Sequence, residues 1–121
     1  MSESGKPKTY DLEDRTFEFA KRVRFFARKL IKDIPNIEDA KQVVRSSGSV
    51  GANYIEANEA LSKKDFLMRV KICRKEAKES RYWLRLVDTG SDAWREGERI
   101  DLEREAKELT AIFGAIVTKS Q

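Results

Sequence analysis

Two carboxylates on one face of a helical segment are the residues in this sequence best suited to acid–base chemistry. Glu76 and Glu79 are three residues apart, and in a helix they lie on one side between Ile72 and Trp83. Paired carboxylates act as general acids and bases, or bind two metal ions inside helical bundles. Such metal sites also use histidine, however, and the chain contains none. We therefore expect no catalytic residue, no metal site and no cofactor, and predict that the protein is not an enzyme.

A structural polar layer is the alternative that we expect for these carboxylates. Their apolar neighbours predict partial burial, so they need hydrogen-bond donors or cations. The predicted layer consists of Arg45, Asn53, Glu56, Glu76 and Glu79, with Arg45 and Asn53 as the leading donors. The one cysteine, Cys73, falls among apolar positions and is predicted to be a small buried side chain rather than a nucleophile.

A row of cations follows another face of the same segment. Residues 62–91 contain nine basic and four acidic side chains, and residues 15–35 contain seven and two. In the first of these segments the basic residues spaced three or four apart are Lys71, Arg74, Lys78, Arg81 and Arg85. Like charges at this spacing destabilise a helix by roughly a few tenths of a kcal/mol per pair. We predict that these five bind nucleic acid, although solvation or pairing with acidic neighbouring helices also explains such a row.

Four amphipathic helices must position these residues. Apolar residues at helical spacing predict a first helix over residues 12–31, ended by Ile34-Pro35, and Asn36 is the predicted N-cap of the second helix. The third begins at the cap residue Ser62 and stops at Gly90, and the fourth begins between residues 91 and 100. The predicted core of the first helix is Phe17, Ala20, Val23, Ala27, Leu30 and Ile31. That of the third is Phe66, Val70, Cys73, Ala77, Ser80, Leu84 and Val87, and that of the fourth is Leu102, Ala106, Leu109, Phe113 and Ile116.

Small residues in the middle of the second helix do not interrupt its pattern. The predicted core stripe keeps its phase across them and runs through Ile37, Ala40, Val44, Ser47, Gly51, Tyr54, Asn58 and Leu61. A glycine inside a helix costs about 1 kcal/mol relative to alanine, which is tolerable where another backbone comes close. We therefore predict one continuous helix rather than a hinge. The predicted close-packing residues are Ser47, Gly48, Gly51 and Ala52.

Short connections between four helices favour antiparallel neighbours. The predicted fold is therefore all-α, an antiparallel up-down-up-down four-helix bundle over residues 12–121 that follows a disordered segment, residues 1–11. No apolar run approaches the roughly 18 residues of a membrane span, and the first residues lack the apolar region of a signal peptide. We expect a cytoplasmic protein with no membrane partner.

Three stretches of the chain resemble a bacterial protein family. They are RSSGSVGANYIEA at residues 45–57, SKKDF at residues 62–66, and RKEAKES followed by YWL at residues 74–84. The family comprises small proteins encoded within intervening sequences of 23S ribosomal RNA genes, related to the accessory variability proteins of diversity-generating retroelements. The resemblance implies an antiparallel four-helix bundle that assembles into a ring-shaped homopentamer. It also implies association with RNA, DNA or a nucleic-acid enzyme through basic surfaces, without established catalysis.

Two hypotheses for function follow. The first is a non-enzymatic homo-oligomer that contacts RNA or DNA electrostatically, with self-assembly through surplus apolar residues such as Tyr54, Trp83 and Leu86. The second is an interaction scaffold whose basic row docks an acidic partner or the neighbouring subunit. An enzyme that uses Glu76 and Glu79 is a remote third. Salt dependence separates the first two, because phosphate binding weakens steeply as salt rises.

Overall fold

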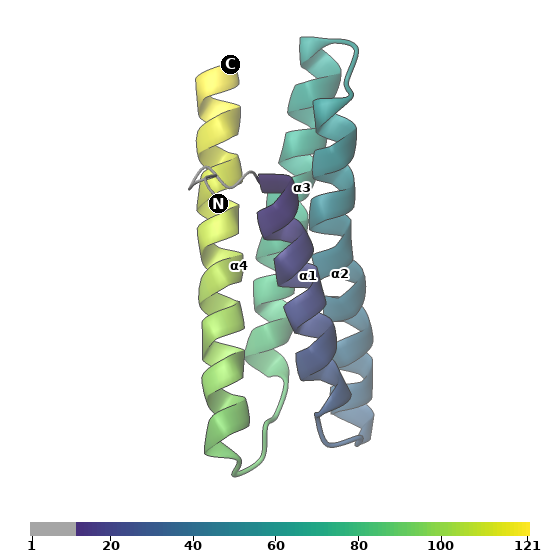
Figure 1. Ribbon diagram of the computed structural model, residues 1–121, viewed down its shortest axis with the longest axis vertical. Coiled ribbons are helices and arrows are strands. Elements are labelled where there is room, and N and C mark those ends of the chain that lie inside the picture. Colours follow the sequence, from purple (N-terminus) through teal and green to yellow (C-terminus); the bar gives the residue numbers. More distant parts are fainter. Residues whose placement is uncertain (1–11) are drawn as a thin grey trace, which may run out of the picture.

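The structure, a computed structural model, describes residues 12–121 as four α-helices that run alternately down and up (Figure 1). The helices are α1 (Leu12–Arg28), α2 (Ile34–Asn58), α3 (Lys63–Leu86) and α4 (Ala93–Ser120). No strand occurs between residues 12 and 121. The predicted antiparallel four-helix bundle is confirmed. The predicted disorder of residues 1–11 lies outside the described residues.

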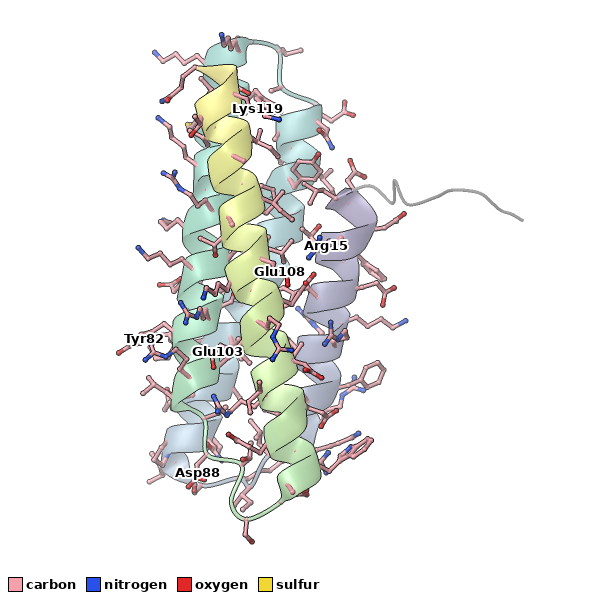
Figure 2. The ribbon with its side chains drawn as sticks, turned by 90° about the vertical axis from the view of Figure 1, so that its left-hand side faces the viewer. Arg15, Tyr82, Asp88, Glu103, Glu108 and Lys119 are labelled. Atoms are coloured by element: carbon pink, nitrogen blue, oxygen red, sulfur yellow. The ribbon has the colours of Figure 1, made fainter. Side chains whose placement is uncertain are left out.

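The shortest helix, α1, covers only part of the bundle. It begins below the upper end of α4 and leaves the uppermost turns of α4 without α1 beside them (Figure 1). Arg15 in its first turn donates from Nε to Glu105 Oε2 at 2.8 Å and from Nη2 to Glu108 Oε1 at 2.9 Å. Figure 2 shows Arg15 and Glu108 facing each other from the two helices. This ion-paired contact joins α1 to α4.

The core stripes predicted for α3 and α4 are those observed. From Val70 to Val87 every predicted α3 core position is buried, and Phe66 is half-buried. On α4 the predicted positions from Leu102 to Phe113 are buried, and Ile116 packs against the core at its edge. Each of these helices has one dominant apolar stripe, so its spacing was sufficient to identify the inward face.

The stripes predicted for α1 and α2 were only partly right: Val23, Leu30 and Ser47 are buried as predicted, but other predicted positions are not. The buried residues of α1 are Thr16, Phe19, Val23 and Phe26, whereas Phe17 and Ile31 are each 61% exposed. The buried residues of α2 are Asn36, Val43, Ser46, Ser47, Val50 and Ala57. The predicted α2 core residue Leu61 is instead 98% exposed, in the connection to α3. Both helices carry two apolar stripes one residue, or about 100°, apart. Periodicity alone does not say which of them faces inward.

Two predicted helix ends also required correction at the α1–α2 connection. The first helix ends at Arg28 rather than residue 31, in a tighter turn where Lys29 N donates to Phe26 O. Asp33, not Asn36, is the N-cap of α2, and its carboxylate accepts from Asn36 N at 2.9 Å. Pro35 therefore lies inside the first turn, where its missing N–H costs no hydrogen bond.

The remaining helix ends agree with expectation except at Gly90. Ser62 is the N-cap of α3 and accepts from Asp65 N at 3.1 Å, and Asp92 is the N-cap of α4. The third helix does not run to Gly90, because its C-cap is Val87. Gly90 has a φ of 68° in the α3–α4 connection, a conformation that glycine adopts readily.

The glycine-containing stretch of α2 is one continuous helix, as predicted. A Cβ atom added to Gly51 would lie 3.0 Å from Thr16 Oγ1 of α1. The same atom at Gly48 would lie 3.2 Å from the flexible Arg24 Nη2. Of these two glycines, only Gly51 would bring a Cβ within 4 Å of the backbone of α1, at 3.7 Å from Thr16 C, and its neighbour Thr16 is buried.

Candidate functional site

Arg45 of α2 joins the two carboxylates of α3. Its Nη2 donates to Glu79 Oε1 at 2.7 Å and to Glu76 Oε1 at 3.4 Å. Glu76 is 7% exposed, whereas Arg45 and Glu79 are partly in solvent. Burial raises the pKa of Glu76, and the positive charge of Arg45 opposes this rise while the nearby Glu79 adds to it. The arrangement is a structural ion-pair network between two helices.

Two predicted members of this layer lie elsewhere. Asn53 Oδ1 accepts from Arg69 Nη1 at 2.9 Å, and its Nδ2 donates to Ser49 O. Glu56 is exposed. Arg45 and Asn53 are eight residues apart, which is about 12 Å along a helix, so one carboxylate pair does not reach both. The layer therefore consists of Arg45, Glu76 and Glu79, and Asn53 forms a separate α2–α3 contact.

Buried polar groups continue the α2–α3 contact. Ser80 Oγ donates to Glu76 O at 2.9 Å and lies 2.7 Å from Ser46 Oγ. Cys73 Sγ donates to Val50 O at 3.4 Å, and burial raises the pKa of this thiol to about 12. Because only the thiolate is a strong nucleophile, Cys73 is held in an unreactive form at neutral pH.

The predicted basic row of α3 divides into two parts. Arg81 Nε lies 3.3 Å from Glu103 Oε2 of α4, and Arg85 Nε lies 4.0 Å from the same oxygen. Figure 2 shows Glu103 on the side of α4 that borders α3. The C-terminal part of the row is therefore neutralised within the bundle.

The N-terminal part of the row has no acidic partner among residues 12–121. We call Lys71, Arg74 and Lys78 the α3 row; all three are exposed, and no carboxylate of residues 12–121 lies within 4.0 Å of their cationic nitrogens. Arg74 lies along α4, where a Cβ added to Gly114 would be 3.7 Å from its Cδ. The α3 row therefore presents three uncompensated charges near the α3–α4 contact.

A second cationic surface was not selected from the sequence. Residues 21–32 contain six basic side chains and no acidic one, and we call them the α1 surface: Lys21, Arg22, Arg24, Arg28, Lys29 and Lys32. None has a carboxylate within 4.0 Å among the residues that the structure describes. Phe25 is 47% exposed and lies beneath the Arg28 guanidinium, 5.3 Å from it. The density of basic residues was the signal that could have identified this surface.

Two features are absent from the described part of the chain. None of its helices combines the length and the hydropathy that a membrane crossing requires. Over residues 12–121, histidine, cysteine and carboxylate side chains do not gather in threes as a metal site would need.

The fold and its surfaces define a class: a small four-helix bundle with a structural ion-pair layer and, over residues 12–121, cations on α1 and α3 that have no carboxylate partner. The family model described as 23S rRNA-intervening sequence protein matches residues 8–115, and the chain belongs to this family. It is also similar to a crystal structure from the S23 ribosomal protein family of Bacteroides thetaiotaomicron VPI-5482, a protein described as having unknown function. That similarity has 31% identity and a TM-score of 0.75, and covers 88% of this chain and 98% of the other. No curated protein matches the chain.

Proposed function

We propose that the protein is a non-enzymatic, homo-oligomeric bundle that contacts RNA or DNA through the α3 row and the α1 surface. The observation that carries this proposal is the lack of carboxylate partners for these nine cations within residues 12–121. Rows of like charge create a positive potential that attracts phosphate backbones.

The arginines of helix α4 differ from the cations of these surfaces, because they have carboxylate partners. Its Arg95, Arg99 and Arg104 each pair with a carboxylate three residues away, at 3.0 Å, 2.6 Å and 3.3 Å. Such alternating charges are typical of a solvated helix face. The α1 surface lacks this pattern altogether, which supports a role in binding a polyanion.

Assembly would strengthen weak contacts. Family resemblance implies a homopentamer, and five chains of net charge +4 would carry a formal charge of +20. Several modest phosphate contacts on one particle then act together and raise the apparent affinity. We expect little sequence preference, because contacts to phosphate carry no direct information about the bases.

Charge-neutralising variants test the proposal. One variant replaces Lys71, Arg74 and Lys78 with glutamine, and a second replaces Arg22, Arg28 and Lys29. The control removes three cations that have carboxylate partners, Lys41, Arg95 and Arg104. Fluorescence anisotropy with labelled RNA and DNA, repeated over a salt series, measures affinity and its slope against salt. Each test variant should bind at least about tenfold more weakly at low salt, with a slope reduced by about 0.7–0.9 per lost phosphate contact.

The control variant should bind like the wild type, and circular dichroism should show an intact bundle in all variants. Wild-type affinity in both test variants, or no binding by the wild type at low salt, would contradict the proposal. The alternative is then a protein-interaction scaffold that docks an acidic partner. Its supporting observation is that Arg81 and Arg85 already hold the carboxylate of Glu103.

A further inference from the structure

Four aromatic side chains are exposed on the part of the chain that the structure describes, residues 12–121. They are Phe17, Phe25, Tyr82 and Trp94, at 61%, 47%, 54% and 74%. Single exposed apolar residues are common on protein surfaces, so exposure alone identifies no site. The charges around the four rings differ, however, and this difference separates Phe25 from the other three.

Phe25 lies among cations. Side chains three and four positions away on a helix are its neighbours on the surface. The four residues at this spacing before and after Phe25 are all basic and all exposed: Lys21, Arg22, Arg28 and Lys29. The nearest acidic residues in the sequence, Glu18 and Asp33, are seven and eight positions away. The ring of Phe25 is therefore at the centre of the α1 surface.

Each of the other three exposed rings has an acidic residue at the same spacing. These are Asp14 three positions before Phe17, Glu79 three before Tyr82, and Glu98 four after Trp94. A carboxylate beside a ring repels the phosphates of a nucleotide that stacks on that ring. Among residues 12–121, Phe25 is thus the exposed ring whose neighbours at this spacing are only basic.

Phe25 is also outside the hydrophobic core. The core position on this turn of α1 is filled by the next residue, Phe26, which is 1% exposed. The contact that the structure shows for the Phe25 ring is with Arg28, whose guanidinium carbon lies 5.3 Å from the ring centroid. About half of the Phe25 side chain therefore remains in solvent, beside a cation that strengthens the stacking of a base on the ring.

An aromatic ring among cations distinguishes the two forms of nucleic acid. In a duplex the faces of the bases are covered by neighbouring base pairs, so the cations contact only its phosphates. The bases of a single strand are free to stack on aromatic side chains. A groove or surface that combines aromatic rings with positive charge is typical of proteins that bind single strands.

We infer that the α1 surface binds single-stranded RNA or DNA, with an unpaired base stacked on Phe25 and the adjoining phosphates paired with Arg22, Arg28 and Lys29. This inference rests on the proposed function, because it names the form of nucleic acid that the α1 surface takes. Every base has an aromatic face, so the contact requires no particular base.

The test replaces the ring and keeps an apolar side chain, in Phe25→Leu. Fluorescence anisotropy compares the variant with the wild type on three labelled ligands: a uridine homopolymer, an abasic strand of the same length and a duplex of mixed sequence. The variant should bind the uridine strand at least about fivefold more weakly. Its affinities for the abasic strand and for the duplex should be unchanged, because the cations remain.

Two further variants are controls for this measurement. Phe25→Trp restores an aromatic ring and should bind the uridine strand at least as tightly as the wild type. Trp94→Leu removes an exposed ring that has Glu98 beside it, and should bind all three ligands like the wild type. Circular dichroism of every variant establishes that the bundle is intact.

Three results would overturn the inference. Unchanged affinity of Phe25→Leu for the uridine strand excludes stacking, while salt-dependent binding of strand and duplex would leave the proposed function standing. Absence of binding by the wild type to any of the ligands at low salt removes both. An apolar residue among cations also suits an anionic membrane surface. Sedimentation with phosphatidylglycerol vesicles that the wild type and Phe25→Leu bind equally, without binding of the uridine strand, would assign the surface to lipid instead.

Discussion

Asn36 of α2 and Asp88 of the α3–α4 connection are joined by two hydrogen bonds. Asn36 Nδ2 donates to Asp88 O at 2.9 Å, and Asp88 N donates to Asn36 Oδ1 at 2.9 Å. The same Nδ2 also donates to Ile31 O at 3.0 Å. Asn36 is buried, and Figure 2 shows Asp88 at the end of the bundle where the connection turns. One amide thus fastens the α1–α2 connection to the α3–α4 connection.

Asn36→Ala should lower the free energy of unfolding by about 2–4 kcal/mol, because buried backbone groups lose their partners. Urea unfolding followed by circular dichroism measures the change. The control is Asn58→Ala on the same helix, where Nδ2 donates to Glu13 at an exposed site. That change should stay within about 0.5 kcal/mol. Equal effects of the two variants would show that Asn36 does not hold the connections together.

Glycines 48 and 51 should respond in opposite directions to substitution. Gly51→Leu should destabilise the bundle by about 1–3 kcal/mol, because its side chain meets the buried Thr16. Gly48→Ala should stabilise it by up to about 1 kcal/mol, since Arg24 is flexible and alanine favours the helix. Thermal and urea unfolding of the two variants measure the difference. A stable Gly51→Leu variant would mean that α1 does not approach α2 closely.

Glu76 should make the bundle more stable as pH falls from neutral toward about 4.5. Its folded-state pKa is raised by burial, so the folded protein takes up a proton more readily than the unfolded chain. Glu76→Gln should abolish this rise. Urea unfolding at a series of pH values between 7 and 5 checks it. A wild-type slope that is unchanged in the variant would assign the effect to another group.

Removal of Arg45 tests the same network from its cationic side. Arg45→Met should cost about 1–2 kcal/mol at pH 7, less than in a fully buried pair because Arg45 is half-exposed. This loss of free energy of unfolding should be smaller at pH 5, where Glu76 is more readily protonated. Lys41→Met, which removes an exposed cation 3.7 Å from Glu38, is the control and should have little effect at either pH.

Glu96 should act in the opposite sense and at lower pH. It accepts hydrogen bonds from Arg99 and Thr89, which lower its pKa to about 2. Its contribution to the free energy of unfolding is therefore complete above its ordinary pKa of about 4.5, and is lost as pH falls toward 2. Glu96→Gln should lower the free energy of unfolding at pH 7 by about 0.5–1 kcal/mol. On acidification, the variant should lose less of this free energy than the wild type. Acid unfolding monitored by circular dichroism compares the two proteins, and parallel curves would contradict the assignment.

The existence of four helices and the inward faces of α3 and α4 could be predicted from residue order. Val70, Cys73 and Ala77 repeat on one dominant stripe, and caps such as Ser62 satisfy backbone groups within a few residues. These are local effects, because helical spacing and capping depend on neighbours along the chain. The ion pair of Arg45 with Glu76 and Glu79 could also be predicted from the sequence, since a half-buried carboxylate requires a cation.

Only the tertiary structure decided which stripe of α1 and α2 is buried and which cations have no carboxylate partner among residues 12–121. Phe17 and Phe19 are equally apolar, and the choice between them depends on how α1 rotates against α2 and α4. The same rotation places Arg15 beside Glu105 and leaves Arg24 over Gly48. Asn36 likewise binds Asp88, 52 residues away, although its local sequence favoured a cap. The orientation of a helix about its axis is set by the sum of its contacts with other helices, and no single segment contains that information.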